Sequence, residues 1–348
     1  MTTLKRRPSD RGVNDRALVS AVSTRVDFLQ LRDRNTTSVA QNFADITDLV
    51  KLNEPTGQLD DDILVSELQS FVDSPDVDIA KDLRLWRDSH GNLIGFGQLF
   101  ISEHNDEVEG YLYFDLHPTR RNDTLGTEIL QWSEQRLREV GEGTVSLKLR
   151  VKSRDDQSDR QILLEKQGFT TERGFLTMAC SLNQSLSSSF MPNGFTLKQL
   201  SWEQDLQAWV ELFNESFIDH WNHHDLTAAT ARQWLNHQHY RPELNLIAVA
   251  PNGTFAAFCV GYINQEENAR NGYSEGWIKL LGTRRDFRKL GLGRAILQAQ
   301  MRQLQAMGVE QVKLGVDAQS LTSATRLYQS VGFYPVHTWL SYVKEIQS

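Results

Sequence analysis

The stretch Leu280–Leu297 reads LLGTRRDFRKLGLGRAIL and joins an apolar, strand-like segment to an amphipathic helical one. Between the two lies a basic loop, Arg284–Gly293, which contains Gly291 and Gly293 at the start of the helix. The free N–H groups of a first helical turn point outward, and the helix macrodipole is positive there. Glycines leave that backbone open to a phosphate, and the basic side chains add positive charge. The stretch therefore predicts a strand–turn–helix unit that binds a diphosphate.

Three phosphate-binding patterns place glycines in such a turn. A Walker A loop requires GxxxxGK[ST], which the sequence does not contain. A dinucleotide fingerprint requires GxGxxG, and the third glycine is replaced here by Ile296. The pattern that remains is RxxGxG, from Arg288 to Gly293. Taken alone, it could equally be a glycine-rich connection without a ligand.

The same order of predicted elements occurs twice in the chain, on either side of a Ser-rich linker at 183–192. The order β-α-α-β-β-β-α-β-α-β-β predicts an α+β fold with a mixed sheet flanked by helices in each half. We expect a disordered basic tail at 1–23, a first domain at 24–182 and a second at 193–348. In the second half we expect strands at 195–200, 276–281 and 311–316, a hairpin at 246–263, a terminal strand pair at 333–338 and 339–345, and helices at 202–221, 227–239, 294–307 and 322–330. In the first half we expect strands at 26–33 and 169–182, a hairpin at 83–101, and helices at 38–50, 61–73, 127–140 and 159–167.

Composition narrows the class of protein. The 348 residues are 39% hydrophobic, and the mean hydropathy is −0.46. This length favours two domains. A net charge of −8 disfavours sequence-independent binding of nucleic acid. The turn at Pro251–Gly253 divides the longest charge-free stretch into a hairpin, so we expect no membrane segment. Cys180 and Cys259 lie in apolar runs, which indicates buried structural thiols and a reducing, cytoplasmic location.

A second motif lies downstream of the glycine turn. Ala324–Phe333 reads ATRLYQSVGF and places Tyr328 one helical turn before Gly332. Together with RxxGxG, this segment resembles the acyl-CoA loop and the "ALRLYxxxGF" helix of the GCN5-related N-acetyltransferase (GNAT) superfamily, in its tandem two-domain type. The resemblance implies an acetyl-CoA-dependent N-acetyltransferase in which the tyrosine protonates the leaving thiolate. The preceding LGVDAQSLT has Ser320 where relatives often have asparagine, which puts that cofactor contact in doubt.

The resemblance also implies how the cofactor is bound. The strand Trp277–Thr283 should separate from the strand Gln311–Val316, and pantetheine should enter the gap like an extra strand. A backbone N–H there should polarise the acetyl carbonyl. No covalent enzyme intermediate is required. The implied cofactor-binding residues are Leu281, Gly282, Thr283, Arg288, Lys289, Leu290, Gly291, Leu292, Gly293, Arg294 and Ser320.

The first half resembles a degenerate copy. In HPTRRNDTLGTEIL, Arg121 and Gly126 match Arg288 and Gly293, but Thr124 replaces Gly291. In ILLEKQGF, Leu164 stands at the position of Tyr328 and has no proton to donate. The first half should therefore bind acyl-CoA weakly or act only as a scaffold.

The acceptor side is less clearly marked. Glu275 is the candidate base; the alternative is an exposed carboxylate at the start of its strand. The acceptor wall should come from Phe217, Asp219, His220 and Trp221, and a histidine there could also serve as base. His220 and His224 have the i, i+4 spacing of a helical metal site. We nevertheless expect no metal, because the helix should end near Asn222 and HExxH is absent.

These observations predict acetyl transfer from acetyl-CoA to the primary amine of a small molecule, at one site in the second half. The acceptor region is rich in convergent polar groups, which favours a small molecule over a protein. The alternative is a tandem pseudoenzyme that senses acyl-CoA or serves as a scaffold. We expect a monomer or homodimer, without nucleic-acid or membrane partners.

Overall fold

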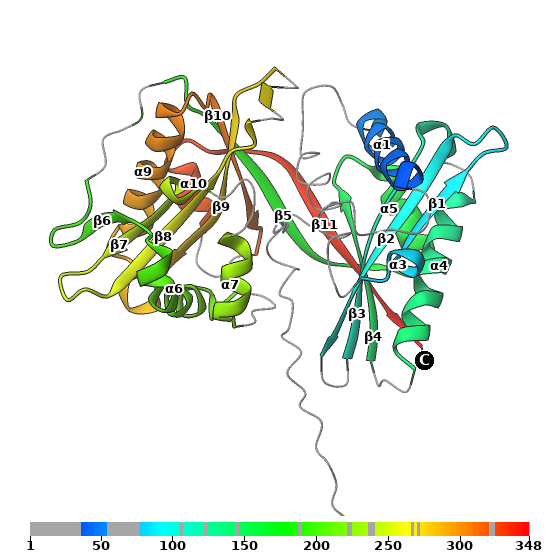
Figure 1. Ribbon diagram of the computed structural model, residues 1–348, viewed down its shortest axis with the longest axis horizontal. Helices are drawn as coiled ribbons and strands as arrows, with labels where there is room; N and C mark the ends of the chain where they lie inside the picture. Colours follow the sequence, from blue (N-terminus) through cyan, green and yellow to red (C-terminus); the bar gives the residue numbers. More distant parts are fainter. Residues whose placement is uncertain are drawn as a thin grey trace, which may run out of the picture.

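The computed structural model describes residues 36–53, 77–104, 107–121, 124–142, 146–184, 186, 190–220, 225–235, 241–265, 268–269, 272–319 and 324–347. The predicted tail at 1–23, strand at 26–33 and helix at 61–73 lie outside these residues. Figure 1 shows two lobes, the first half of the chain forming one and the second half the other.

One mixed sheet runs through both lobes. Its strand order is β1-β2-β3-β4-β11-β5-β10-β9-β8-β7-β6. In the first half the strands are β1 (Leu83–Arg87), β2 (Leu93–His104), β3 (Glu107–Leu116), β4 (Ser146–Arg154) and β5 (Thr170–Ser181). In the second half they are β6 (Thr196–Gln199), β7 (Asn245–Val249), β8 (Phe255–Tyr262), β9 (Glu275–Thr283), β10 (Gln311–Asp317) and β11 (Tyr334–Ile346).

The two halves exchange their last strands. β5 of the first half pairs antiparallel with β10 of the second, over Phe175–Ser181. β11 of the second half pairs antiparallel with β4 of the first, over Trp339–Ile346, and the C-terminus lies in the first lobe beside α4 (Figure 1). The sequence predicts a pair of strands at 333–338 and 339–345; the structure has a single long strand there instead. β11 stays continuous because two register irregularities against β5 bend it without a turn.

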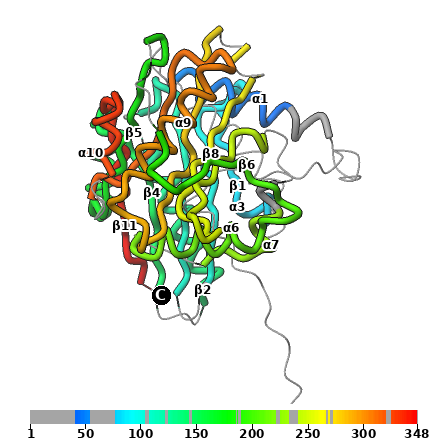
Figure 2. The backbone as a smooth tube through the Cα atoms, turned by 90° about the vertical axis from the view of Figure 1, so that its left-hand side faces the viewer, coloured from blue at the N-terminus to red at the C-terminus, as the bar shows by residue number. Residues whose placement is uncertain are grey.

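Helices cover both faces of the sheet (Figure 2). In the second half, apolar residues of α9 pack with those of β7 to β9 on one face, and those of α6 pack on the other. In the first half, α4 and α1 take the corresponding positions. The helices are α1 (Thr36–Asn53), α3 (Ile79–Asp82), α4 (Leu125–Val140), α5 (Ser158–Lys166), α6 (Trp202–Phe217), α7 (Ala228–Leu235), α9 (Leu292–Ala306) and α10 (Ala324–Gln329), with 3-10 turns η1 (Pro118–Arg120), η2 (Pro242–Leu244) and η3 (Arg285–Phe287).

Local capping explains several helix ends. Thr227 Oγ1 accepts the N–H of Thr230 at 3.1 Å and so caps the N-terminus of α7. α9 is followed by Gly308 in the left-handed conformation (φ 86°), which ends the helix. α6 ends at Phe217, earlier than the predicted Trp221.

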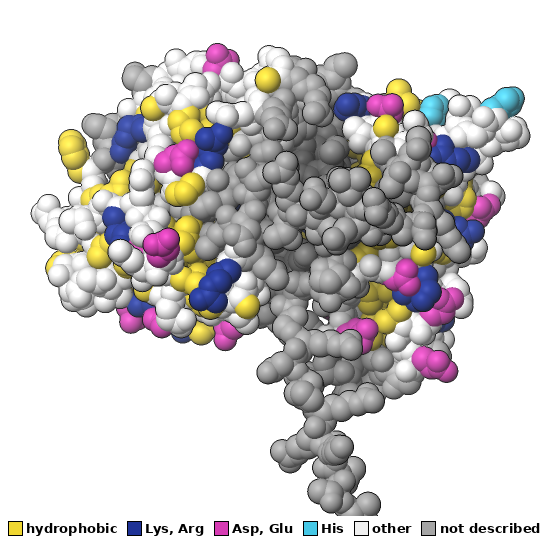
Figure 3. Space-filling view, viewed as in Figure 1, with side chains coloured by type: hydrophobic (Ala, Val, Ile, Leu, Met, Phe, Trp, Pro, Cys, Tyr) yellow, Lys and Arg dark blue, Asp and Glu magenta, His cyan; other side chains and the backbone are white. Residues whose placement is uncertain are grey.

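Charged side chains of both signs are interspersed over the described parts of both lobes in Figure 3. Such a distribution favours short-range ion pairs over a field of one sign. No helix among the described residues is long and apolar enough to cross a membrane.

Candidate active site

The predicted diphosphate turn has the backbone conformation that an anion site requires. Lys289 and Gly291 both have a left-handed φ, 65° and 86° respectively. Gly291 is the N-cap of α9 and supplies no side-chain hydrogen bond; the ladder of the helix begins with Ala295 N–H donating to Gly291 O at 3.1 Å. The amides of Leu292–Arg294 therefore have no acceptor among the described residues. They form the outward-facing, positive end of the helix.

The two glycines of the turn leave space above it. A Cβ atom built on Gly291 would meet no heavy atom within 4 Å, although its positive φ would strain any other residue. A Cβ atom on Gly293 would lie 3.5 Å from side-chain atoms of Leu327 and Thr283, an ordinary contact. Neither glycine is needed for internal packing. The open cradle above the turn fits a diphosphate.

The strands before and after α9 separate as predicted. β9 and β10 pair in parallel only over Glu275–Ile278 and Gln311–Leu314, and both continue beyond this ladder. On its other side β9 carries a bulge at Lys279, because the register with β8 shifts there: Leu280 is opposite Val260, and Ile278 is opposite Gly261. Bulges re-aim backbone groups and are common beside active sites. The bulge lies where the two strands part.

The alternation of hydrogen bonds shows which backbone groups face the gap. Arg284 donates its N–H to Ala256 O on β8 at 2.9 Å. Because neighbouring residues of a strand face opposite sides, Gly282 also faces β8, whereas Leu281 and Thr283 face the gap toward β10. A Cβ atom on Gly282 would come within 2.3 Å of the Phe258 ring. Gly282 therefore permits close packing, and the backbone groups of its two neighbours are directed to the gap.

Tyr328 is a titratable side chain that is buried in the core of the second half. It lies on α10 in the same apolar cluster as Leu292 and Val316, and its ring meets Phe333 edge-to-face at 5.9 Å. Burial raises the pKa of the Tyr328 phenol well above its usual range, and the neighbouring Cys259 adds to the effect. The hydroxyl therefore stays protonated at neutral pH, which is the state a general acid needs.

The two cysteines are buried and free, which confirms the sequence prediction. Burial raises the pKa of both thiols. A thiol kept protonated is a poor nucleophile. Neither cysteine has the chemistry of a covalent catalyst.

Arg288, predicted to face the diphosphate, binds protein acceptors instead. Its Nε donates to Thr283 O at 3.2 Å, Nη2 to Ser216 O at 3.0 Å and Nη1 to Asp219 Oδ2 at 2.7 Å. Asp219, predicted to contact the acceptor, also ion-pairs with Arg285. The Arg288 and Arg285 guanidinium groups lower the pKa of Asp219. Asp219 and Arg288 thus connect the end of α6 to the turn before α9.

We predict that Asp219→Asn loosens this connection. The KM for acetyl-CoA should rise roughly two- to fivefold with little change in kcat, because surface ion pairs contribute modestly. The pKa of Asp219 is lowered from its ordinary value of 3.8, so the carboxylate stays charged at every pH from 5 to 9. The effect of the substitution on KM should therefore be the same throughout this range. Steady-state kinetics of this variant and of Asp286→Asn, an exposed acid on the same turn, provide the comparison. Equal KM values for both variants would contradict the positioning role.

Glu275, the candidate base, is the first residue of β9. It is 9% exposed and ion-pairs with Lys313 of β10, so the alternative of an exposed carboxylate is wrong. It lies on the face opposite Ile278, whose side chain belongs to the α9 core. The next residue on Glu275's face is Trp277. The carboxylate therefore belongs to the α6 side of the sheet, where the acceptor wall was predicted.

The acceptor wall is partly described. Phe217 packs edge-to-face with Phe258 and with His220, at 6.0 and 5.7 Å between ring centroids. Trp221 of the predicted wall, His224 and the predicted cofactor residue Ser320 lie outside the described residues. Within the described part of the chain, no three His, Cys, Asp or Glu side chains gather to hold a metal ion.

Sequence reasoning missed a cation–aromatic cluster at the bulge. Lys279 Nζ lies 4.9 Å from the centroid of the Tyr262 ring and 5.4 Å from that of Trp277. Such contacts contribute about 0.5–2 kcal/mol according to their exposure. Bulges leave little trace in residue patterns, so no sequence signal marked Lys279.

The first half lacks these features at the corresponding places. Thr124 has a right-handed φ of −74°, unlike Gly291. β2 and β3 pair without a register shift, so β3 has no bulge. Leu164 is fully buried at the position of Tyr328.

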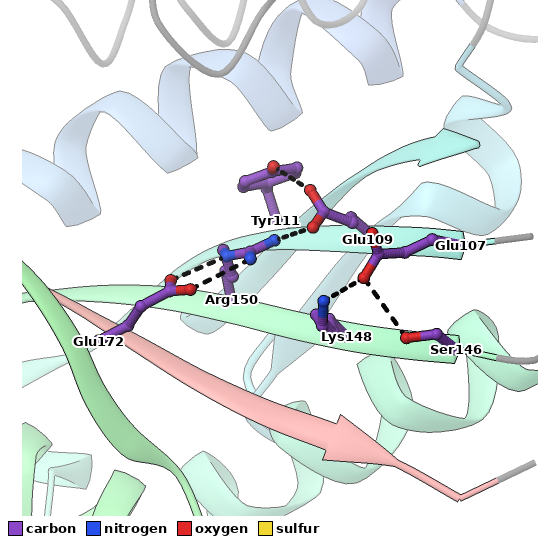
Figure 4. Close-up of polar contacts among 7 residues, drawn as sticks. All are labelled: Glu107, Glu109, Tyr111, Ser146, Lys148, Arg150 and Glu172. Atoms are coloured by element: carbon purple, nitrogen blue, oxygen red, sulfur yellow. Dashed lines mark hydrogen bonds and ion pairs between the residues drawn. The ribbon is translucent and has the colours of Figure 1, made fainter. Parts of the chain in front are cut away.

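A polar network lies across β3, β4 and β5 of the first half (Figure 4). Arg150 on β4 donates to both carboxylate oxygens of Glu172 at 3.0 and 3.2 Å and ion-pairs with Glu109. Tyr111 Oη donates to Glu109 at 2.5 Å. Each of these charges has a protein partner, so the network is satisfied without a ligand.

Comparison with known proteins agrees with this geometry. The model of the acetyltransferase (GNAT) family matches residues 206–333. A protein from Kineococcus radiotolerans named mycothiol acetyltransferase is 31% identical over 268 residues, covering 74% of this chain and 80% of that protein. The protein of the same name from Thermobispora bispora is 26% identical and covers 66% and 77%.

Solved structures show the same fold. A GCN5-related N-acetyltransferase from Sphaerobacter thermophilus superposes with a TM-score of 0.71 at 24% identity, covering 88% of this chain and 94% of that chain. A tandem GNAT protein from the clavulanic acid biosynthesis pathway gives 0.66 at 13% identity, covering 89% and 96%. With its duplicated fold and its matched second half, the chain belongs to the GNAT family of acetyltransferases, in the tandem form, and is an N-acetyltransferase.

Proposed function

We propose that the chain transfers the acetyl group of acetyl-CoA to the primary amine of a small molecule, at one site in residues 193–348. The observation that carries this proposal is the left-handed turn at Lys289–Gly291, followed by the amides of Leu292–Arg294, which have no acceptor within the described part of the chain. Its open cradle fits the diphosphate of the cofactor. The relatives named mycothiol acetyltransferase support a small-molecule acceptor.

Acetyl-CoA, when bound, supplies an activated thioester. The backbone groups of Leu281 and the N–H of Thr283 face the gap and would bind the pantetheine arm as an added strand, whereas the Thr283 carbonyl already accepts from Arg288. The bulge at Lys279 changes the direction of the backbone groups of β9, and we place the carbonyl oxygen of the thioester, which must be polarised, beside it. The acceptor nitrogen attacks the carbonyl carbon and the carbon–sulfur bond breaks.

Two protons must move in this reaction. The Tyr328 hydroxyl donates one to the departing sulfur, supported by the burial that keeps it protonated. Glu275 would receive the proton that the amine loses, through water, after its carboxylate leaves Lys313. For the first half we propose a scaffold, supported by Leu164 and Thr124 at the two key positions. We also propose a cytoplasmic location, supported by the two free buried thiols.

The test is thiol release from acetyl-CoA by the full chain in the presence of a panel of small primary amines, followed with a thiol-reactive chromophore. Release should depend on the amine and should be stoichiometric with the acetylated product found by mass spectrometry. Tight binding of CoA without turnover of any amine would contradict the enzyme proposal and support the sensor alternative.

A further inference from the structure

We infer that Arg160 occupies the first half's counterpart of the cofactor gap, so that each chain binds one acyl-CoA. The inference rests on the proposed function, because it compares this place with the proposed site between β9 and β10. It concerns residues of the first half alone, and its test reads the number of cofactors bound.

Arg160 extends from α5 to the place where β3 and β4 separate. The parallel ladder of these strands ends at Leu112 and Val151. Just beyond it, Arg160 Nη1 donates to Phe114 O on β3 at 2.8 Å, and Nε donates to Lys152 O on β4 at 3.1 Å. The guanidinium carbon lies 3.9 Å from the centroid of the Phe114 ring. One side chain thus bridges both edges of the gap.

The next carbonyl along β3 is also taken. Asn53, at the end of α1, donates from Nδ2 to Leu116 O at 2.7 Å, and its Oδ1 accepts from Arg121 at 2.7 Å. His117 donates its N–H to a carbonyl of β2. Because the backbone groups of successive strand residues point to opposite sides, those of Leu116 and Phe114 point away from β2 and toward β4. These are the groups that an added strand would bind. In the first half they already accept hydrogen bonds from the chain's own side chains.

The charge of Arg160 is compensated in place. Asp115 lies beside it; burial raises the pKa of this carboxyl to about 6, and the Arg160 guanidinium opposes that rise. A ligand entering here would break two hydrogen bonds and separate a partly desolvated charge pair. Removing one partner of such a pair is costly.

The second half differs at this position by one side chain. Counting back from the Gly-Phe that follows each helix, Ala324 on α10 corresponds to Arg160 on α5. Ala324 has only a methyl group, which packs against the apolar cluster around Tyr328. A methyl group cannot bridge β9 and β10. Among the described residues, no side chain of the second half bridges the two strands at Leu281 as Arg160 bridges them at Phe114. The Thr283 carbonyl, like that of Leu116, already accepts a hydrogen bond, from Arg288 Nε at 3.2 Å, so the two halves differ at the bridging side chain alone.

The test counts bound cofactors by equilibrium dialysis of the full chain against radiolabelled coenzyme A. The parent should saturate at one per chain. Thr124→Gly restores the glycine of the first-half turn but leaves Arg160, so it should also saturate at one. Thr124→Gly with Arg160→Ala should approach two. The two variants differ only at Arg160, and binding at the second-half site reports whether each is folded.

The outcomes separate the two proposals. Two cofactors on the parent, two on Thr124→Gly, or no gain from Arg160→Ala would overturn the inference. A parent that binds none, with a double variant that binds one, would support the inference and refute the proposed second-half site.

A reciprocal variant tests the same side-chain position without any change to the first half, so misfolding of that half cannot affect the result. Ala324→Arg introduces the bridging side chain into the second half. It should weaken binding of coenzyme A by about 100-fold, the ratio expected for a few lost hydrogen bonds. Unchanged affinity would show that a guanidinium at this position does not close the gap, and the inference would fail.

Discussion

Replacing Tyr328 with phenylalanine should lower kcat by about 100- to 10,000-fold, the usual contribution of a positioned general acid. The ring fills a buried place beside Phe333, and phenylalanine keeps that packing, so the KM for acetyl-CoA should change little. The raised pKa of the phenol also predicts that the parent's kcat does not fall near pH 10 through loss of this proton.

The control is Tyr334→Phe, at an exposed tyrosine six positions along that is 49% accessible. Its kinetics should match the parent. Steady-state thiol release gives kcat for all three proteins. If the Tyr328→Phe variant has the same kcat as the parent, Tyr328 is not the general acid.

Gly291→Val should raise the Kd for coenzyme A by about 100- to 1000-fold. The loss of charge-assisted hydrogen bonds to the diphosphate costs about 1.5–3 kcal/mol for each bond. The strain of a β-branched residue at φ 86°, about 1–2 kcal/mol, lowers the stability of the fold instead. The valine side chain would also stand in the open space above the α9 amides. Isothermal titration calorimetry measures the change.

The matched control is Gly308→Val at the other end of α9. Gly308 also has φ 86°, and a Cβ atom there also meets nothing within 4 Å. Both variants should therefore lower the melting temperature to a similar extent. Only Gly291→Val should lose affinity; equal loss in both would attribute the effect to strain and contradict the assignment of the turn.

The local parts of the fold could be predicted from the sequence. The strand–turn–helix around Gly291 and the hairpin at Pro251–Gly253 both depend on neighbouring residues. Their turn residues and apolar spacing carry the information within a few positions. The position of Tyr328 next to Gly332 likewise follows from the spacing of one short helix.

The exchanged strands could not be predicted in this way. β5 pairs with β10, and β11 with β4, across distant parts of the chain. A strand's alternation indicates its buried face but not its partner. Two tandem sheets that close on themselves would show the same patterns as two sheets that exchange their ends.

The partners of charged side chains were also beyond the sequence. Arg288 was assigned to the diphosphate because it lies in a basic loop, but it donates to Asp219 and to backbone carbonyls. Arg160 carries no motif at all. Its role depends on two strands that separate at Phe114 and Lys152, which only the folded chain shows.

The most direct measurement is a crystal structure of the chain soaked with coenzyme A. We predict density for the diphosphate on the amides of Leu292–Arg294, with the pantetheine arm along Leu281–Thr283 between β9 and β10. A ligand bound elsewhere, or a turn that stays empty at a saturating concentration, would contradict it.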